Sequence, residues 1–183
     1  MNYFIDTEFT CLPWDNDPEL ISIAVVDEND REYFACLNDF SAESVSPFVK
    51  ENVLSYLPDV SERKKREVVS NEIHRFLSYN HPTRIWCLFP TASELIEWGF
   101  KASEIDSVME RYGDIDLRFL KELLGFRYST EWPERGSDLV PLVDYLKEKG
   151  DLPDNEEIHN ALADARWNKK VWERHKKYKT KNS

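Results

Sequence analysis

The sequence has no run of about 18 consecutive apolar residues, the length that a membrane-spanning helix needs. Residues 1–4 contain neither a basic region nor a long apolar core, so no secretory signal is recognised. Cysteine is also scarce, since Cys11, Cys36 and Cys87 are odd in number and far apart. This spacing excludes a disulfide framework and a C-x-x-C metal site. These absences predict a cytoplasmic protein with free thiols and no membrane contact.

Basic residues are fewer than acidic residues in this sequence. The 24 Lys and Arg residues face 35 Asp and Glu residues, which gives a net charge of −11 at pH 7. Such a balance excludes a protein that coats nucleic acid by bulk attraction, but it allows an enzyme that engages a nucleic-acid end through metal ions. Residues 166–181 are the exception, because they hold eight cations and one acid. We interpret them as a solvated helix end, where cations suit the helix dipole, with contact to phosphate as the alternative.

Length and composition predict a single globular domain. The chain has 183 residues, 41% of them hydrophobic and 32% charged, which is enough to bury a core and unlike a disordered protein. No internal repeat or low-complexity linker divides it. We therefore expect one domain over residues 1–178, followed by a basic tail at 179–183.

Hydrophobic patterning predicts an α/β fold. Apolar and β-branched segments predict strands at residues 3–6, 19–27, 31–37 and 84–89. The first three strands follow one another closely, so they are expected to form an antiparallel meander. Helical spacing predicts helices at residues 41–57, 61–77, 92–98, 139–149 and 160–176, and residues 114–124 are interpreted as a short strand or turn that leads into a helix. The order of these elements indicates a mixed sheet flanked by helices.

Two acids lie two residues apart in the first strand, Asp6 and Glu8. Residues i and i+2 of a strand point to the same face, so both carboxylates project together. Like charges held that close repel unless a cation lies between them, and a hard divalent ion prefers such oxygen ligands. The pair therefore indicates a metal site, with two solvated acids on a surface strand as the alternative.

A second group of polar residues lies at the start of the last predicted helix. Asp164 shares a helix face with Ala161 and Asn168, and the small alanines allow this helix to approach the sheet closely. A buried aspartate is costly without a cation or hydrogen bonds, and a metal shared with the first strand would provide the partner. His159 lies just before the helix and could act as a general base at the same site. The alternative for His159 is a structural or solvated histidine.

These segments resemble one known family. The stretches F-I-D-T-E-F, E-L-I-S-I-A-V-V and H-N-A-L-A-D-A-R occur in the order, and with the separation, of the DEDDh group of 3′–5′ exonucleases. The closest likeness is to small bacterial exoribonucleases of the ribonuclease AS type, and it covers nearly the whole chain. The resemblance implies a ribonuclease H-like mixed sheet, an antiparallel meander joined by parallel strands. It also implies a homodimer that removes nucleotides from the 3′ ends of single-stranded RNA, with DNA as a second candidate substrate.

The resemblance also implies roles for individual residues. Asp6, Glu8 and Asp164 match acids that bind two Mg²⁺ or Mn²⁺ ions, and His159 matches the base that deprotonates the attacking water. The pocket for the 3′-terminal nucleotide would be lined by Thr7, Phe9 and Thr10. For Phe9, ordinary packing is the alternative to stacking on a base. Glu19 could accept a hydrogen bond from a base amino group, or be a solvated strand end.

The sequence departs from the family pattern at one acid. The family carries a further aspartate at the start of the helix after the central strand, and counting from Trp86 places this position at Ser93. Three alternatives follow: Glu94 takes its place, Asp114 or Asp116 does, or the metal site is impaired. The last alternative describes a protein that holds nucleic-acid ends or a protein partner without turnover.

Overall fold

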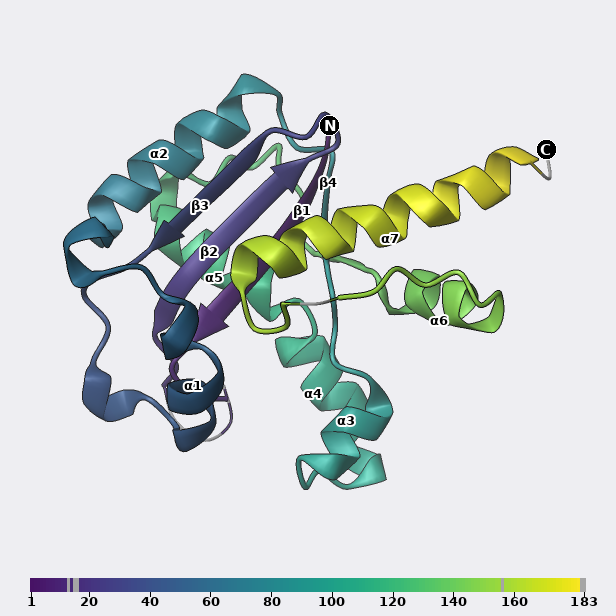
Figure 1. Cartoon of the computed structure of the whole chain (residues 1–183), viewed down its shortest axis with the longest axis horizontal. Helices are drawn as coiled ribbons and strands as arrows, with labels where there is room; N and C mark the ends of the chain where they lie inside the picture. Colours follow the sequence, from purple (N-terminus) through teal and green to yellow (C-terminus); the bar gives the residue numbers. More distant parts are fainter. Residues whose placement is uncertain (13, 15–16, 156, 182–183) are drawn as a thin grey trace.

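A mixed β-sheet forms the centre of the computed structural model, which describes residues 1–12, 14, 17–155 and 157–181 (Figure 1). The described residues form five strands in the order β3-β2-β1-β4-β5. β2 is antiparallel to β1 and β3, whereas β4 is parallel to β1 and to β5. The strands are β1 (Asn2–Phe9), β2 (Leu20–Asp27), β3 (Glu32–Cys36), β4 (Arg84–Cys87) and β5 (Ser137–Asp138). The predicted mixed sheet with an antiparallel meander is confirmed.

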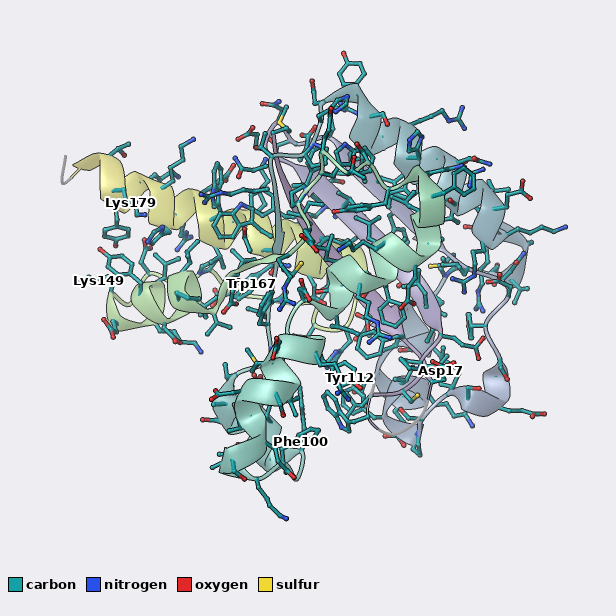
Figure 2. All side chains as sticks on the ribbon, turned by 180° about the vertical axis from the view of Figure 1, so that it is seen from behind. Asp17, Phe100, Tyr112, Lys149, Trp167 and Lys179 are labelled. Atoms are coloured by element: carbon teal, nitrogen blue, oxygen red, sulfur yellow. The ribbon has the colours of Figure 1, made fainter. Side chains whose placement is uncertain are left out.

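Helices cover both faces of this sheet. The long helix α7 (Ala161–Lys181) crosses one face over β1 and β2, and α6 (Val140–Glu148) packs beside it. On the other face lie α5 (Ile115–Leu124) and α2 (Arg66–Tyr79), seen from behind in Figure 2.

Alternate side chains of β1 supply the two cores. Tyr3 and Ile5 enter the core under α2 and α5, and Phe4 enters the core that Trp167 of α7 shares with α6.

The remaining helices are short. α1 (Pro47–Asn52) lies beside the meander, and α3 (Ala92–Glu97) and α4 (Ile105–Tyr112) lie beyond the end of the sheet (Figure 1). Within the described residues, 3₁₀ turns occupy Ala42–Ser44, Leu54–Tyr56, Val60–Glu62, Ala102–Glu104 and Gly125–Arg127.

Several predicted boundaries are wrong. The helix expected at 41–57 is α1 with a 3₁₀ turn on either side, and its N-cap Ser46 precedes Pro47, which suits the first helical position. Ser61 caps no helix, because α2 begins only at Arg66. α4 and β5 were not predicted from the pattern. At the other end, α7 continues through Lys181, so no boundary falls at residue 178, and residues 182 and 183 lie outside the described part.

The second half of β1 is where the sheet opens. β4 pairs with β1 only over Asn2–Phe4, although β1 continues to Phe9. Beyond Phe4, side chains from α5 and α7 form hydrogen bonds with backbone groups of β1 that β4 does not pair. Asn168 Nδ2 donates to the Ile5 carbonyl at 3.1 Å, and the Thr7 amide donates to Asp116 Oδ1 at 3.0 Å. These bonds satisfy buried backbone groups and draw α5 and α7 together around the end of β1.

Among the described residues, no helix is both long enough and apolar enough to cross a membrane.

Candidate active site

Three carboxylates meet where β1 passes under the start of α7. Asp6, Glu8 and Asp164 each offer an oxygen, and these oxygens lie within 4.8 Å of one another. The two-residue period of β1 points Asp6 and Glu8 toward α7, as the spacing predicted. Ala161 and Ala165 are buried against Ala24 and Val26 of β2, so α7 lies close enough for Asp164 to reach them.

Asp116 is a fourth acid at the same place, and it comes from the other face of the sheet. It lies in the first turn of α5 and is 5% exposed. Its Oδ1 accepts two hydrogen bonds from Thr7, from the amide at 3.0 Å and from the hydroxyl at 2.6 Å. After burial, its charge is the largest influence on the pKa of Asp6, which it raises. Asp116, one of the candidates that the sequence left open, therefore lies next to the acidic group.

The pKa values of all four acids are raised, and those of Asp6, Glu8 and Asp116 are raised strongly. Burial, then the charges of the other acids, raises the pKa of Asp6 well above its usual range. Burial, then Asp164 and Asp116, raises the pKa of Glu8 to about 8. Burial raises the pKa of Asp116 to about 7, although its hydrogen bonds from Thr7 act in the opposite direction. The carboxylates of Asp6, Glu8 and Asp164 are a donor set that fits a hard divalent ion, since such an ion supplies the missing counter-charge and displaces the protons.

Asn155 holds the carboxylate of Asp164. Its side-chain amide donates to Asp164 Oδ1 at 2.6 Å. Burial raises the pKa of Asp164, and the Asn155 hydrogen bond, together with contacts from His159, lowers it. Asn155 lies in irregular chain before α7, where no periodic pattern marks it, so sequence reasoning missed it.

His159 lies next to Asp164, in a turn with a strained backbone conformation. Its φ is +66°, a left-handed conformation that residues other than glycine rarely adopt. The next residue, Asn160, caps α7 by accepting from the amides of Leu162 and Ala163. The His159 ring meets the ring of Phe48 from α1 edge-to-face, with centroids 5.0 Å apart, and Phe48 is 54% exposed. The fold thus places the predicted base beside Asp164 and packs its ring against an exposed aromatic side chain.

Two of the residues predicted to contact substrate are used within the fold. Thr10 is fully buried, and its hydroxyl accepts from the Glu19 amide at 3.0 Å. The Glu19 carboxylate accepts from the amide of Ser41. Thr10 and Glu19 thus have structural roles that join β1, β2 and the turn before α1, and their contact with substrate stays a prediction.

Thr7 and Phe9 lie on the α5 side of β1. Thr7 is 5% exposed and its hydroxyl is committed to Asp116, so it positions an acid of the cluster. Phe9 stacks on Phe119 of α5 with ring centroids 5.2 Å apart, at the margin of the core. This contact follows the packing alternative for Phe9.

Glu94 and Ser93 lie outside the acidic cluster, which corrects the expectation placed on them. Glu94 is exposed, and its Oε2 accepts from the amide and hydroxyl of Thr91, both at 2.7 Å, in a capping box. Asp114 is also engaged elsewhere, since its Oδ2 accepts from the Gly136 amide and pairs with Arg135.

The count from Trp86 failed because α3 and α4 come between β4 and the helix that returns to the sheet. The sequence does carry a signal for that helix, the apolar stripe of Leu117, Leu120 and Leu123, all of which are buried. Within α3, by contrast, Leu95 is buried while Ile96 is 52% exposed. A helix with a continuous apolar stripe is the one that packs on a sheet.

Similarity to known proteins agrees with this geometry. Two curated proteins from strains of Mycobacterium tuberculosis, each named a 3′–5′ exoribonuclease, are 29% identical to the chain over 174 residues. The match covers 91% of this chain and 88% of each relative. No protein-family model matches the sequence. The resemblance to 3′–5′ exoribonucleases that the motifs indicated is confirmed.

A solved structure supports the fold. The crystal structure of cell-death related nuclease 4 (CRN-4) superposes with a TM-score of 0.52 at 14% sequence identity. The match covers 97% of this chain but 64% of that nuclease, so the chain spans less than two thirds of its length. At this identity the similarity shows the α/β fold alone.

Proposed function

We propose that this protein is a metal-dependent 3′–5′ exonuclease that hydrolyses single-stranded RNA from its 3′ end. The observation that carries the proposal is the convergence of Asp6, Glu8 and Asp164 at the end of β1. Asp116 lies near Asp6, and His159 lies beside Asp164. The curated relatives named 3′–5′ exoribonuclease support the choice of RNA over DNA. The homodimer implied by the resemblance stays a prediction that light scattering can test.

The four carboxylates would hold two Mg²⁺ or Mn²⁺ ions. When bound, such ions supply positive charge for the oxygens that attack and leave the phosphorus. Thr7 and Asn155 fix two of the carboxylates, Asp116 and Asp164, through hydrogen bonds of 2.6 Å each. This support holds the ligands in one geometry before the ions arrive.

His159 would accept the proton of the attacking water. It must be neutral to do so, and its position next to Asp164 places it at the edge of the cluster. Its contact with Phe48 limits the directions in which the ring can turn. The base is thus held by its own strained backbone and by a neighbouring ring.

A second reading, a nuclease fold that binds without turnover, rested on Ser93. The position of Asp116 near Asp6 supports the catalytic proposal over this alternative.

The proposal is tested by incubating the protein with end-labelled single-stranded RNA, or DNA of the same sequence, in Mg²⁺ or Mn²⁺. We expect stepwise shortening from the 3′ end and release of mononucleotides, with RNA preferred. His159→Ala and Asp6→Ala should lower the rate by roughly 10²-fold or more, as expected for loss of a general base or a metal ligand. If the wild-type protein releases no more nucleotide than these two variants, the proposed function is wrong.

A further inference from the structure

The C-terminal part of α7 projects beyond the sheet. In Figure 1 this end of the helix extends away from the strands with α6 alongside, and in Figure 2 Lys179 of α7 and Lys149 after α6 lie at the same end of the molecule. We call residues 172–180 of α7 the basic arm. It lies at the far end of the helix from Asp164 and takes no part in the acidic cluster.

Ion pairs engage several cations along α7, Arg174 of the basic arm among them, whereas two neighbouring lysines of the arm form none. Arg166 forms a bidentate pair with Glu32, Lys169 pairs with Asp30, and Arg174 pairs with Asp151. Lys176 and Lys177 are exposed, and neither forms an ion pair with any other described residue. In a chain with a net charge of −11, this arm is therefore a local region of positive potential.

A cleft of about 150 Å³ lies between the basic arm and the edge of the sheet. Cations and aromatic rings share its walls. The Arg84 guanidinium carbon lies 5.6 Å from the ring centroid of Trp86, and Lys176 Nζ lies 4.7 Å from that of Trp172. The rings belong to or pack against the core, so the cations are the groups of this cleft that a phosphate backbone could contact. Basic groups that follow the backbone are used by proteins that bind single-stranded nucleic acid.

One rigid helix links this cleft to the acidic cluster. Asp164 lies in the first turn of α7 and Lys176 lies twelve residues later, which corresponds to about 18 Å along the helix axis. Without bound metal, the acidic cluster offers no positive charge to a phosphate backbone, so attraction for a polyanionic substrate has to come from another part of the surface. The basic arm is placed to provide it.

We propose that the basic arm and Arg84 bind the backbone of the substrate RNA several nucleotides upstream of the 3′ end that is cleaved. The inference rests on the proposed function for its substrate class. At about 3.4 Å per stacked nucleotide, 18 Å corresponds to roughly five nucleotides. A dinucleotide is then too short to reach from the acidic cluster to the arm, whereas a longer RNA engages both.

The test compares Lys176→Glu/Lys177→Glu with a control of equal charge change, Lys65→Glu/Arg75→Glu, whose residues are exposed on and before α2. Binding of an unstructured RNA of roughly 20 nucleotides is measured by fluorescence anisotropy in EDTA, where no hydrolysis takes place. We expect the arm variant to lose affinity by about tenfold or more at low salt. Its plot of log affinity against log salt should become shallower by about 1.4, the value for two lost phosphate contacts to a single strand. Arg84→Glu, on a different element, should act in the same direction, and the control should bind as the wild type does.

Hydrolysis provides an independent readout. In Mg²⁺ the arm variant should cleave a dinucleotide within about twofold of the wild-type rate and lose efficiency on the long RNA through a higher KM. Unchanged RNA affinity in the arm variant, or an equal loss in the control, overturns the proposal. A change of molecular mass in light scattering with unchanged RNA affinity also overturns it and assigns the arm to contact between copies of the chain. Loss of RNA affinity in a protein whose wild type hydrolyses nothing upholds the arm and refutes the nuclease function.

Discussion

Replacing Glu8 with glutamine is expected to stabilise the metal-free protein at neutral pH while weakening its binding of divalent ions. Glu8 is 9% exposed, and burial with the charges of Asp164 and Asp116 raises its pKa to about 8, against an ordinary value of 4.5. The folded state therefore holds a proton that the unfolded chain has already released. Glutamine keeps the shape of the side chain and carries no charge at any pH.

The sign and size of the effect follow from these pKa values. Below about pH 4.5 Glu8 is protonated in both the folded and the unfolded state, so it does not lower the free energy of unfolding. As the pH rises from about 4.5 to about 8, the unfolded state gains from ionising and the folded state does not, so stability falls. At about 1.4 kcal/mol for each pH unit, the loss at pH 7 is roughly 3 kcal/mol, as an upper figure. Glu8→Gln removes this loss and also lets the remaining acids of the cluster ionise more easily.

Urea denaturation in EDTA between about pH 5 and pH 8 measures the effect. The stability of the wild type should fall across this range more steeply than that of Glu8→Gln. Mg²⁺ at a hundred times its Kd should remove most of the difference, because it adds about 2.7 kcal/mol to a protein that binds it, close to the loss of roughly 3 kcal/mol. Glu97→Gln, at an exposed position of α3, is the control and should leave the pH dependence unchanged. A Glu8→Gln protein that is no more stable than the wild type in EDTA at neutral pH would refute the reasoning.

Three further predictions concern other parts of the site. Asp116→Asn should lower the rate of RNA hydrolysis by roughly 10²-fold, since it weakens metal binding, whereas Glu94→Gln should keep the rate within about twofold of the wild type. The reverse result would assign the fourth metal-binding acid to Glu94 of α3. Thr7→Val removes the hydroxyl that lowers the pKa of Asp116, so half-maximal activity should require more Mg²⁺ and a higher pH, and an unchanged Mg²⁺ titration would contradict this role. Asn168→Ala leaves the buried Ile5 carbonyl without its donor and should lower the free energy of unfolding by about 1–3 kcal/mol. The control Lys170→Ala, on the exposed face of α7, should lower it by less than about 0.5 kcal/mol. Equal losses would show that the hydrogen bond is not the cause.

Short-range patterns predicted the part of the site that depends on one element at a time. The two-residue period of a strand was enough to direct Asp6 and Glu8 to one face. The alanines around Asp164 indicated a helix that approaches the sheet closely, and in the structure Ala161 and Ala165 are buried against β2. Both conclusions need only local geometry and residue size, which a sequence displays directly.

The sequence did not predict the contacts between segments that are far apart along the chain. Counting from Trp86 pointed to Ser93, because the count assumed that the next helix returns to the sheet. Nothing in the spacing showed that α3 and α4 would intervene and leave this task to α5. Thr10 and Glu19 carry side chains that suit a ligand, yet the fold uses them to join β1, β2 and the turn at Ser41.

By itself, the sequence determined the order of the main elements, the mixed sheet, and the likeness of its D-x-E and H-x-A-x-x-D motifs to 3′–5′ exoribonucleases. Periodicity, residue size and motif order can be read directly from the sequence, without knowledge of the tertiary structure. Tertiary structure alone decided that Asp116 joins the acids, because β4 stops at Cys87 and leaves the Thr7 amide of β1 open to a carboxylate from α5. It also decided which cations of α7 form ion pairs, since Arg166, Lys169 and Arg174 find acids that are distant in sequence or on the next turn, whereas Lys176 and Lys177 form no ion pair with any described residue.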